Sequence, residues 1–136
     1  MIKALFFLKR KAGISHEQFR EHFETSHAHL AHEHFGHLMI GYQRNYPSQV
    51  RLGATHAAQQ DVDYDVDCVS EWFLADEEAL EKIFAILSSP DIGPIFREDE
   101  AKFLDVSKTV VIRFHEGDVV DTGTDGEGGN RIVLPA

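Results

Sequence analysis

The pattern of hydrophobic and polar positions divides the chain into short apolar runs and amphipathic stretches. Apolar runs over 2–9, 66–74 and 106–116 have the length and residue types of β-strands. A further run, 37–46, predicts another strand, in which Gly41 weakens the pairing or marks a bulge. We therefore expect four strands.

The longest amphipathic stretch runs from Ser15 to His37 and holds seven of the nine histidines. Ser15 and Gln18 have the spacing of a capping box, which predicts a helix start, and Gly36 is a plausible end. Positions at steps of three and four predict one helical face, made of Phe19, Phe23, His27, Leu30 and His34.

Asp76 is expected to cap a second helix over 77–88, and a short helix is expected over 95–104. The predicted order β-α-β-β-α-β is that of the ferredoxin-like α+β fold, a four-stranded antiparallel sheet with helices on one face. We expect this domain to span 1–117, followed by a flexible Gly/Asp-rich tail over 118–136. The segment 48–63 has no sustained period, which predicts a long loop that selects the substrate.

One sheet face would be left bare and largely apolar in a monomer, so we expect two chains to pack face to face as a homodimer. The formal net charge of −10, from 13 basic and 23 acidic residues, argues against a nucleic-acid partner. No apolar run is long enough for a membrane span, and the N-terminus lacks a signal-peptide pattern. The single cysteine, Cys68, excludes an internal disulfide and fits a reducing compartment. A cytoplasmic location is the expectation.

The sequence resembles the EthD-type family of the dimeric α/β-barrel superfamily. The matching segments are MIKALFFLKRKAGISHEQFREHF, ETSHAHL, DCVSEWFLADEEAL and AKFLDVSKTVVIRF. His27 stands where the family usually carries a histidine. Asp67 and Glu71 stand at the acidic positions of a DxVxExW-like strand, although Trp72 comes one place early.

The resemblance implies a homodimer with a binding pocket between sheet and helices. It does not imply one reaction, because relatives act as lyases, isomerases, cyclases or decarboxylases on lactones, polyketides and aromatic compounds. Acid–base chemistry without a cofactor is their common theme. The fold by itself is a weak guide to function.

His27 is the first candidate catalytic residue, because an imidazole on an apolar helical face can transfer protons near neutral pH. A core histidine bonded to a carbonyl is the alternative. Asp67 and Glu71 share a strand face with apolar residues, so either carboxylate is a candidate orienter of His27 or a base itself. The alternative is an interfacial salt bridge to an arginine such as Arg10, Arg44 or Arg113.

Tyr42 is a candidate hydrogen-bond donor to a carbonyl or oxyanion, with simple packing as the alternative. His115 is an outside candidate, and Cys68 is expected to be a core residue rather than a nucleophile. The predicted substrate-binding residues are Phe7, Phe23, His34, Val69 and Trp72.

The remaining histidines raise the question of a metal site. His29/His32 and His34/His37 are spaced by three residues, yet no HExxH motif is present, since residue 36 is glycine. A solvated helix face is the preferred interpretation, and we expect no metal site.

These observations favour an enzyme that needs no cofactor, a lyase or isomerase acting on a hydrophobic carbonyl compound. The expected substrate is an aromatic or polyketide-like molecule that undergoes dehydration, decarboxylation, cyclisation or lactone isomerisation. Two alternatives stay open: a non-catalytic protein that binds metal or haem through the histidine-rich helix, and a ligand-binding stabiliser of a larger catabolic complex.

Overall fold

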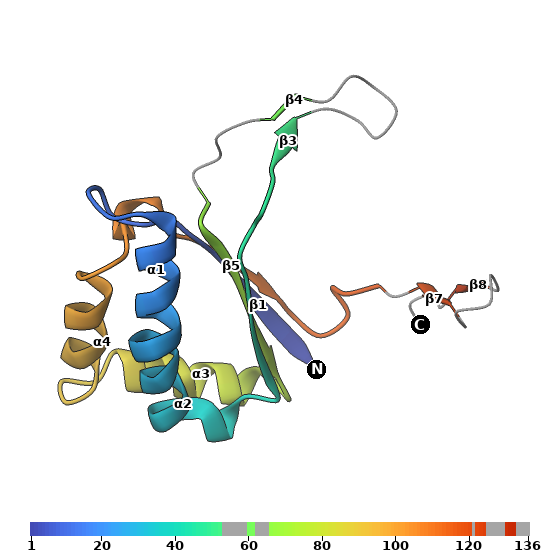
Figure 1. Cartoon of the computed structure of the whole chain (residues 1–136). Coiled ribbons are helices and arrows are strands. Elements are labelled where there is room, and N and C mark those ends of the chain that lie inside the picture. The colour runs from blue at the N-terminus through green and yellow to red at the C-terminus, as the bar shows by residue number, and fades with distance from the viewer. Residues whose placement is uncertain (53–59, 62–65, 121, 125–129, 133–136) are drawn as a thin grey trace.

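The computed structural model describes residues 1–52, 60–61, 66–120, 122–124 and 130–132, and the fold is drawn in Figure 1. A four-stranded antiparallel sheet carries the helices on one face, as the predicted ferredoxin-like order requires. The strands lie in the order β2-β5-β1-β6. Their bounds are β1 Ile2–Leu8, β2 Gly41–Asn45, β5 Cys68–Leu74 and β6 Val110–Phe114. The helices are α1 His16–His22, α2 Ala28–Phe35, α3 Glu77–Leu87 and α4 Gly93–Glu100.

Two small antiparallel pairs lie outside this sheet. In the predicted substrate-selecting loop, β3 (Arg51–Leu52) pairs with β4 (Gln60–Asp61), and in the predicted tail β7 (Thr122–Thr124) pairs with β8 (Asn130–Ile132). The rest of the loop beyond residue 52, and most of the tail beyond residue 120, lie outside the described residues. The loop's role in substrate selection and the flexibility of the tail stay predictions.

The first helix begins as predicted. Ser15 accepts a hydrogen bond from the Gln18 backbone N–H, while the Gln18 side chain accepts one from Ser15 N–H. The predicted helix is not continuous, however, because a π-helical turn over Phe23–His27 separates α1 from α2.

Because of this turn, the buried helical face differs from the predicted one. A π-turn adds one residue to the helix, so every later side chain is rotated relative to a regular 3.6-residue pattern. Beyond the turn the buried positions are Ala28, Ala31 and Phe35, one residue later than the predicted Leu30 and His34. The pattern drawn through the whole segment was therefore right for α1 and wrong for α2.

Two predicted strands start later than expected, because 3₁₀ turns precede them. Gly36–Leu38 and Val106–Lys108 form these turns, and β2 and β6 begin at Gly41 and Val110. Gly41 opens its strand without a bulge and faces Phe73, whose ring lies 3.2 Å from where a Cβ on Gly41 would stand. Asp76 caps α3 as predicted, accepting a hydrogen bond from the Ala79 N–H.

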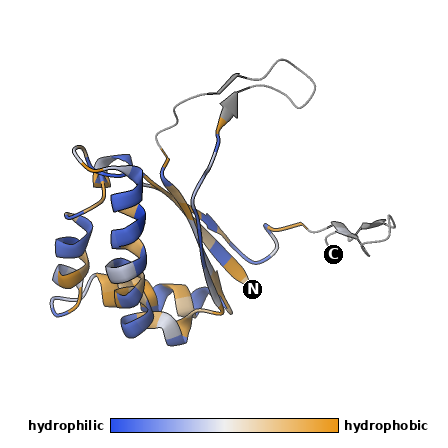
Figure 2. Cartoon of the chain, viewed as in Figure 1, coloured by the Kyte–Doolittle hydropathy of each residue, from blue (hydrophilic) through white to orange (hydrophobic). Residues whose placement is uncertain are grey.

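The core lies between the sheet and the helices, in two clusters. One gathers Phe35, Trp72 and Phe96, and the other gathers Phe19, Phe23 and Phe103. Phe6 and Tyr42, from β1 and β2, pack against both clusters. In Figure 2 the helices are apolar toward the sheet and hydrophilic on their outer sides. None of the described helices is long and apolar enough to cross a membrane.

On the other sheet face lies no helix of the described part of the chain. Strand register places Leu5, Phe7, Val69, Phe73 and Ile112 on it, with Glu71 directly opposite both Leu5 and Gln43. Val110 and Ile112 expose 52% and 39% of their surface. This is the bare apolar face that the sequence predicted.

Candidate functional site

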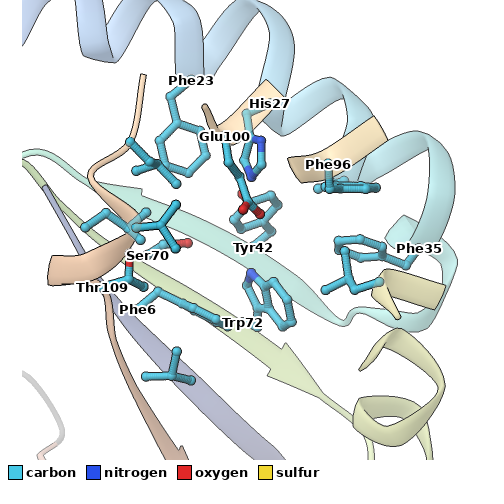
Figure 3. A pocket seen from close by; sticks show the side chains of 16 residues that line it. Phe6, Phe23, His27, Phe35, Tyr42, Ser70, Trp72, Phe96, Glu100 and Thr109 are labelled. Atoms are coloured by element: carbon cyan, nitrogen blue, oxygen red, sulfur yellow. The ribbon is translucent and has the colours of Figure 1, made fainter. Parts of the chain in front are cut away.

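A cavity of about 160 Å³ lies between sheet and helices, where the two core clusters would otherwise join. Figure 3 shows side chains from strands and helices pointing into it. Its walls are mainly apolar and include the rings of Phe6, Phe23, Phe35, Trp72 and Phe96. Its polar side chains are His27, Tyr42, Ser70, Glu100 and Thr109. An apolar cavity of roughly 150 Å³ accommodates benzene, so the volume fits a molecule with one six-membered ring.

The π-turn positions His27. This residue ends the turn, and its ring points into the cavity above Glu100 and Tyr42 (Figure 3). On the other side of the ring, Nδ1 lies 3.0 Å from Oδ2 of Asp99, a residue of α4. Because a carboxylate only accepts, Nδ1 carries the proton in the neutral ring and Nε2 keeps a free lone pair. Asp99 therefore fixes both the orientation and the tautomer of His27.

Asp99 is buried and has two further partners. Ser26 Oγ donates to its Oδ1 over 2.7 Å, and His22 Nε2 lies 3.0 Å from the same oxygen. Burial by itself would raise the pKa of Asp99, but the hydrogen bonds from Ser26 and His27 hold this pKa below its ordinary value. Asp99 is thus a carboxylate held as an anion inside the protein.

The ring of His27 is enclosed by phenylalanines. The rings of Phe23, Phe96 and Phe103 have their centroids 5.4, 5.7 and 5.1 Å from that of His27. This burial lowers the pKa of His27 below 6.5, although the bond to Asp99 works in the opposite direction. His27 is consequently a neutral imidazole at neutral pH, the form that accepts a proton.

Tyr42 lies beside His27 on the sheet side of the cavity (Figure 3). Burial raises the pKa of its hydroxyl well above the ordinary value, while the cation of Arg44 and a hydrogen bond with Ser70 act against the rise. The guanidinium of Arg44 stacks 4.6 Å from the Tyr42 ring centroid. Tyr42 thus keeps its proton, so it can donate a hydrogen bond but does not act as a base.

Two further polar groups in the cavity have no hydrogen-bond partner among the described residues. Thr109 Oγ1 is buried and unbonded. The half-buried carboxyl of Glu100 faces the cavity, and burial raises its pKa. Buried polar groups normally have partners, so the Thr109 hydroxyl and the Glu100 carboxyl are available to a bound molecule.

The structure brings four of the predicted site residues together at this cavity: Phe23, His27, Tyr42 and Trp72. It does not bring the others there. Phe7, Val69 and Glu71 lie on the bare sheet face, where Phe7 lines a shallow hollow with Val66, Lys108 and Val110. His34 packs edge-on against Phe96, with a centroid distance of 5.7 Å, and lies outside the cavity lining because of the π-turn.

Asp67 is buried at the end of the sheet and is not part of the cavity lining. It accepts from the Arg10 backbone N–H over 2.8 Å and from Arg10 Nη1 over 3.4 Å, and it pairs with His16 and Lys9. The expected pairing of His27 with Asp67 or Glu71 is therefore wrong. The alternative of a salt bridge to Arg10 is what the structure shows for Asp67.

The carboxyl groups at the site, Asp99 and Glu100, were not predicted from the sequence. A signal was present: Phe96, Asp99, Glu100 and Phe103 follow each other at steps of three, one and three, so the carboxyls interrupt an apolar helical stripe. The same argument had identified His27. Ser70 alternates with Cys68 and Trp72 on the buried, helix-facing side of β5.

The other candidate groups are arranged as follows. Cys68 is fully buried, which raises the pKa of its thiol to about 12, as expected of a core residue. His115 pairs at the surface with Glu77. His29, His32 and His37 are exposed. Across the described ranges, no three His, Cys, Asp or Glu side chains are grouped so that they could hold a metal ion.

Comparison with known proteins supports the fold. The EthD domain matches residues 11–107. An EthD-family protein of Bacillus halodurans is 18% identical, with a TM-score of 0.55 over 85% of this chain and 99% of its own. A hypothetical protein of Arabidopsis thaliana is 19% identical in its solution structure, with a TM-score of 0.53 over 87% of this chain and 89% of its own. The crystal structure of the same Arabidopsis protein gives a TM-score of 0.55 over 88% of this chain and 98% of its own. No curated protein matches.

Proposed function

The chain belongs to the EthD family, and from the cavity within its domain we propose that it is an acid–base enzyme acting on a small cyclic carbonyl compound. One observation carries this proposal. His27, oriented by the buried carboxylate of Asp99, faces an aromatic cavity that also holds a hydroxyl donor. A base, a group that orients it and an oxyanion donor around one space are the parts that proton abstraction next to a carbonyl requires.

In this mechanism, Nε2 of His27 takes a proton from the carbon next to the substrate carbonyl. Asp99 stabilises the imidazolium that forms, because its carboxylate accepts the Nδ1–H bond. Tyr42 donates a hydrogen bond to the carbonyl oxygen as negative charge develops there. The aromatic walls hold the substrate ring and exclude water.

The cavity size restricts the substrate. About 160 Å³ fits a single ring, which favours a monocyclic lactone, enone or aromatic precursor over a folded polyketide chain. The outcome is an isomerisation or an elimination, since both begin with loss of this proton.

The test uses cyclohex-3-enone, a six-membered ketone with an activated CH₂ group between carbonyl and double bond. Nuclear magnetic resonance in deuterium oxide measures exchange at this carbon. We expect the wild-type protein to accelerate exchange, and His27→Gln to slow it by ~10²-fold or more. His16→Gln, which removes another histidine bonded to an aspartate, is the control and leaves the rate unchanged.

Binding is measured separately. Trp72 is the only tryptophan and lines the cavity, so a ring ligand there changes its fluorescence. A ligand that changes Trp72 emission without any exchange above the buffer rate would contradict the proposed function and leave a binding protein.

We also propose that a second copy of the chain covers the bare sheet face. Exposed apolar side chains on that face, together with the absence of a helix over it in the described residues, support this partner. Ile112→Lys is expected to convert a dimer to a monomer in analytical ultracentrifugation. Ile95→Lys is the matched control, since Ile95 is 41% exposed, like Ile112 at 39%, but lies on α4. A monomeric wild-type protein would exclude the dimer.

A further inference from the structure

Glu100 is a second titratable group in the cavity, and the mechanism above does not use it. It is the last residue of α4, and its carboxyl points into the cavity below the His27 ring and beside Tyr42 (Figure 3). The preceding residue, Asp99, turns to the other side and holds His27 Nδ1. Two consecutive residues of one helix thus lie near the same imidazole, Asp99 bonded to its Nδ1 and Glu100 beside it in the cavity lining.

The surroundings of Glu100 favour its protonated form. The cavity walls are mainly apolar, and no hydrogen bond from a described residue reaches its carboxyl. Burial raises the pKa of Glu100, with Arg97 opposing the rise and Asp99 adding to it. Burial lowers the pKa of His27. The two pKa shifts have the directions that a base–acid pair requires, toward a neutral imidazole and a neutral carboxylic acid.

We propose that Glu100 is a catalytic acid that returns a proton to a second carbon of the substrate, so that the enzyme is an isomerase that moves a double bond. This inference rests on the proposed function of His27. It selects isomerisation over elimination, because both proton-transfer groups face one cavity sized for a single ring.

The step balances within the site. The C–H bond next to the carbonyl breaks, its proton goes to His27 Nε2, and its electron pair forms a dienolate whose oxygen accepts from Tyr42. The Glu100 O–H bond then breaks, its proton forms a C–H bond at the far carbon of the dienolate, and the conjugated ketone results. Glu100 is left as a carboxylate and His27 as an imidazolium. Transfer of one proton from His27 to Glu100 restores both groups.

The test follows two rates with cyclohex-3-enone in deuterium oxide: deuterium exchange next to the carbonyl, and conversion to cyclohex-2-enone. Glu100→Gln keeps the shape of the side chain but removes the acid. We expect the ratio of conversion to exchange to fall by ~10²-fold or more, in line with the usual contribution of a general acid. Glu98→Gln, an exposed position on the same helix, is the matched control and keeps the wild-type ratio.

The outcomes separate the two proposals. An unchanged ratio in Glu100→Gln, or an equal fall of both rates, overturns the role of Glu100 while exchange by the wild-type protein still supports His27. No exchange by the wild-type protein overturns the function proposed for His27 and, with it, this inference. If Glu100→Gln does not fold, Glu100→Asp replaces it. This variant keeps an acid on a shorter side chain, so a lowered ratio supports the proposal and an unchanged ratio overturns it.

Discussion

Among the described residues, two aspartates each bond to Nδ1 of a histidine, and only one of these two pairs includes a residue of the cavity lining. His16 Nδ1 lies 3.0 Å from Asp67, and His27 Nδ1 lies 3.0 Å from Asp99. Both aspartate side chains are 6% exposed. By distance and by burial of the carboxylate, the pairs are equivalent.

Their surroundings differ. Asp67 is also paired with two cations, Lys9 and Arg10, and it joins the end of β1 to the start of α1. The side chain of His16 is 31% exposed, against 14% for His27. His27 has phenylalanines around its ring and a cavity below it. A histidine–aspartate pair thus becomes a candidate base only where its second nitrogen faces a largely apolar cavity.

Removing each carboxylate tests this contrast most directly. Asp99→Asn is expected to slow exchange of cyclohex-3-enone by on the order of 10²-fold, because an amide can present an N–H to His27 and favour the wrong tautomer. Asp67→Asn is expected to leave the rate within about twofold, once corrected for the folded fraction. Nuclear magnetic resonance of the exchanging CH₂ group measures both. Equal losses in the two variants would show that the pairs do not differ in function.

The stability of the same two variants should show the reverse order. Asp67→Asn leaves Lys9 and Arg10 without their buried anion and weakens a link between two elements, at a cost of about 2 kcal/mol in the free energy of unfolding. Asp99→Asn loses bonds from neutral donors and is expected to cost about 1 kcal/mol. Urea denaturation at neutral pH measures both. A larger loss for Asp99→Asn would contradict a mainly structural role for Asp67.

The sequence predicted one member of each pair for a physical reason. His27 and Asp67 were recognised because polar groups on apolar faces of regular elements are costly. The four-stranded sheet, the order of strands and helices along the chain, and the caps at Ser15 and Asp76 were predicted. They were predictable because alternation and capping are local signals. The pairing of His27 with Asp99 was not predicted, since it joins residues 72 positions apart across two helices.

The π-turn is the other feature that the sequence pattern concealed. A regular helical period through Phe19, Phe23 and His27 continues to His34, whereas the inserted residue moves Ala31 and Phe35 to the buried face. Only packing against α4 and the sheet distinguishes the two registers. Asp99 and Glu100 were predictable, because they lie on the Phe96–Phe103 stripe, but the acidic run around them resembles a solvated face.

The pH dependence of stability should distinguish His27 from His16. Burial lowers the pKa of His27 below its unfolded value of 6.5, so the unfolded chain binds the proton more readily. The contribution of His27 to stability is complete above pH 6.5 and is lost as the pH falls from there through the folded pKa. On acidification, we expect the free energy of unfolding of His27→Gln to fall by up to about 1 kcal/mol less than that of the wild-type protein. The fall in His16→Gln should equal that of the wild-type protein. Urea denaturation at several pH values measures the difference. Identical pH profiles for wild-type protein and His27→Gln would contradict a buried neutral imidazole.

Glu100 is expected to have the smallest effect on stability, and its pH dependence should be opposite in sign to that of His27. Burial raises the pKa of its carboxyl, so the unfolded chain releases this proton more readily, and the resulting loss of stability is absent at acidic pH and grows as the pH rises from 4.5 through the folded pKa. Glu100→Gln should therefore stabilise the protein at neutral pH by a few tenths of a kcal/mol, because water still screens a half-buried group, and should have no effect near pH 4. Thermal unfolding at the two pH values measures the change, with Glu98→Gln as the exposed control. A variant that is more stable and yet converts the ketone more slowly would show that the carboxyl is retained for the reaction at the expense of the fold. A destabilised variant at neutral pH would instead show that Glu100 supports α4, and that the cavity tolerates its charge.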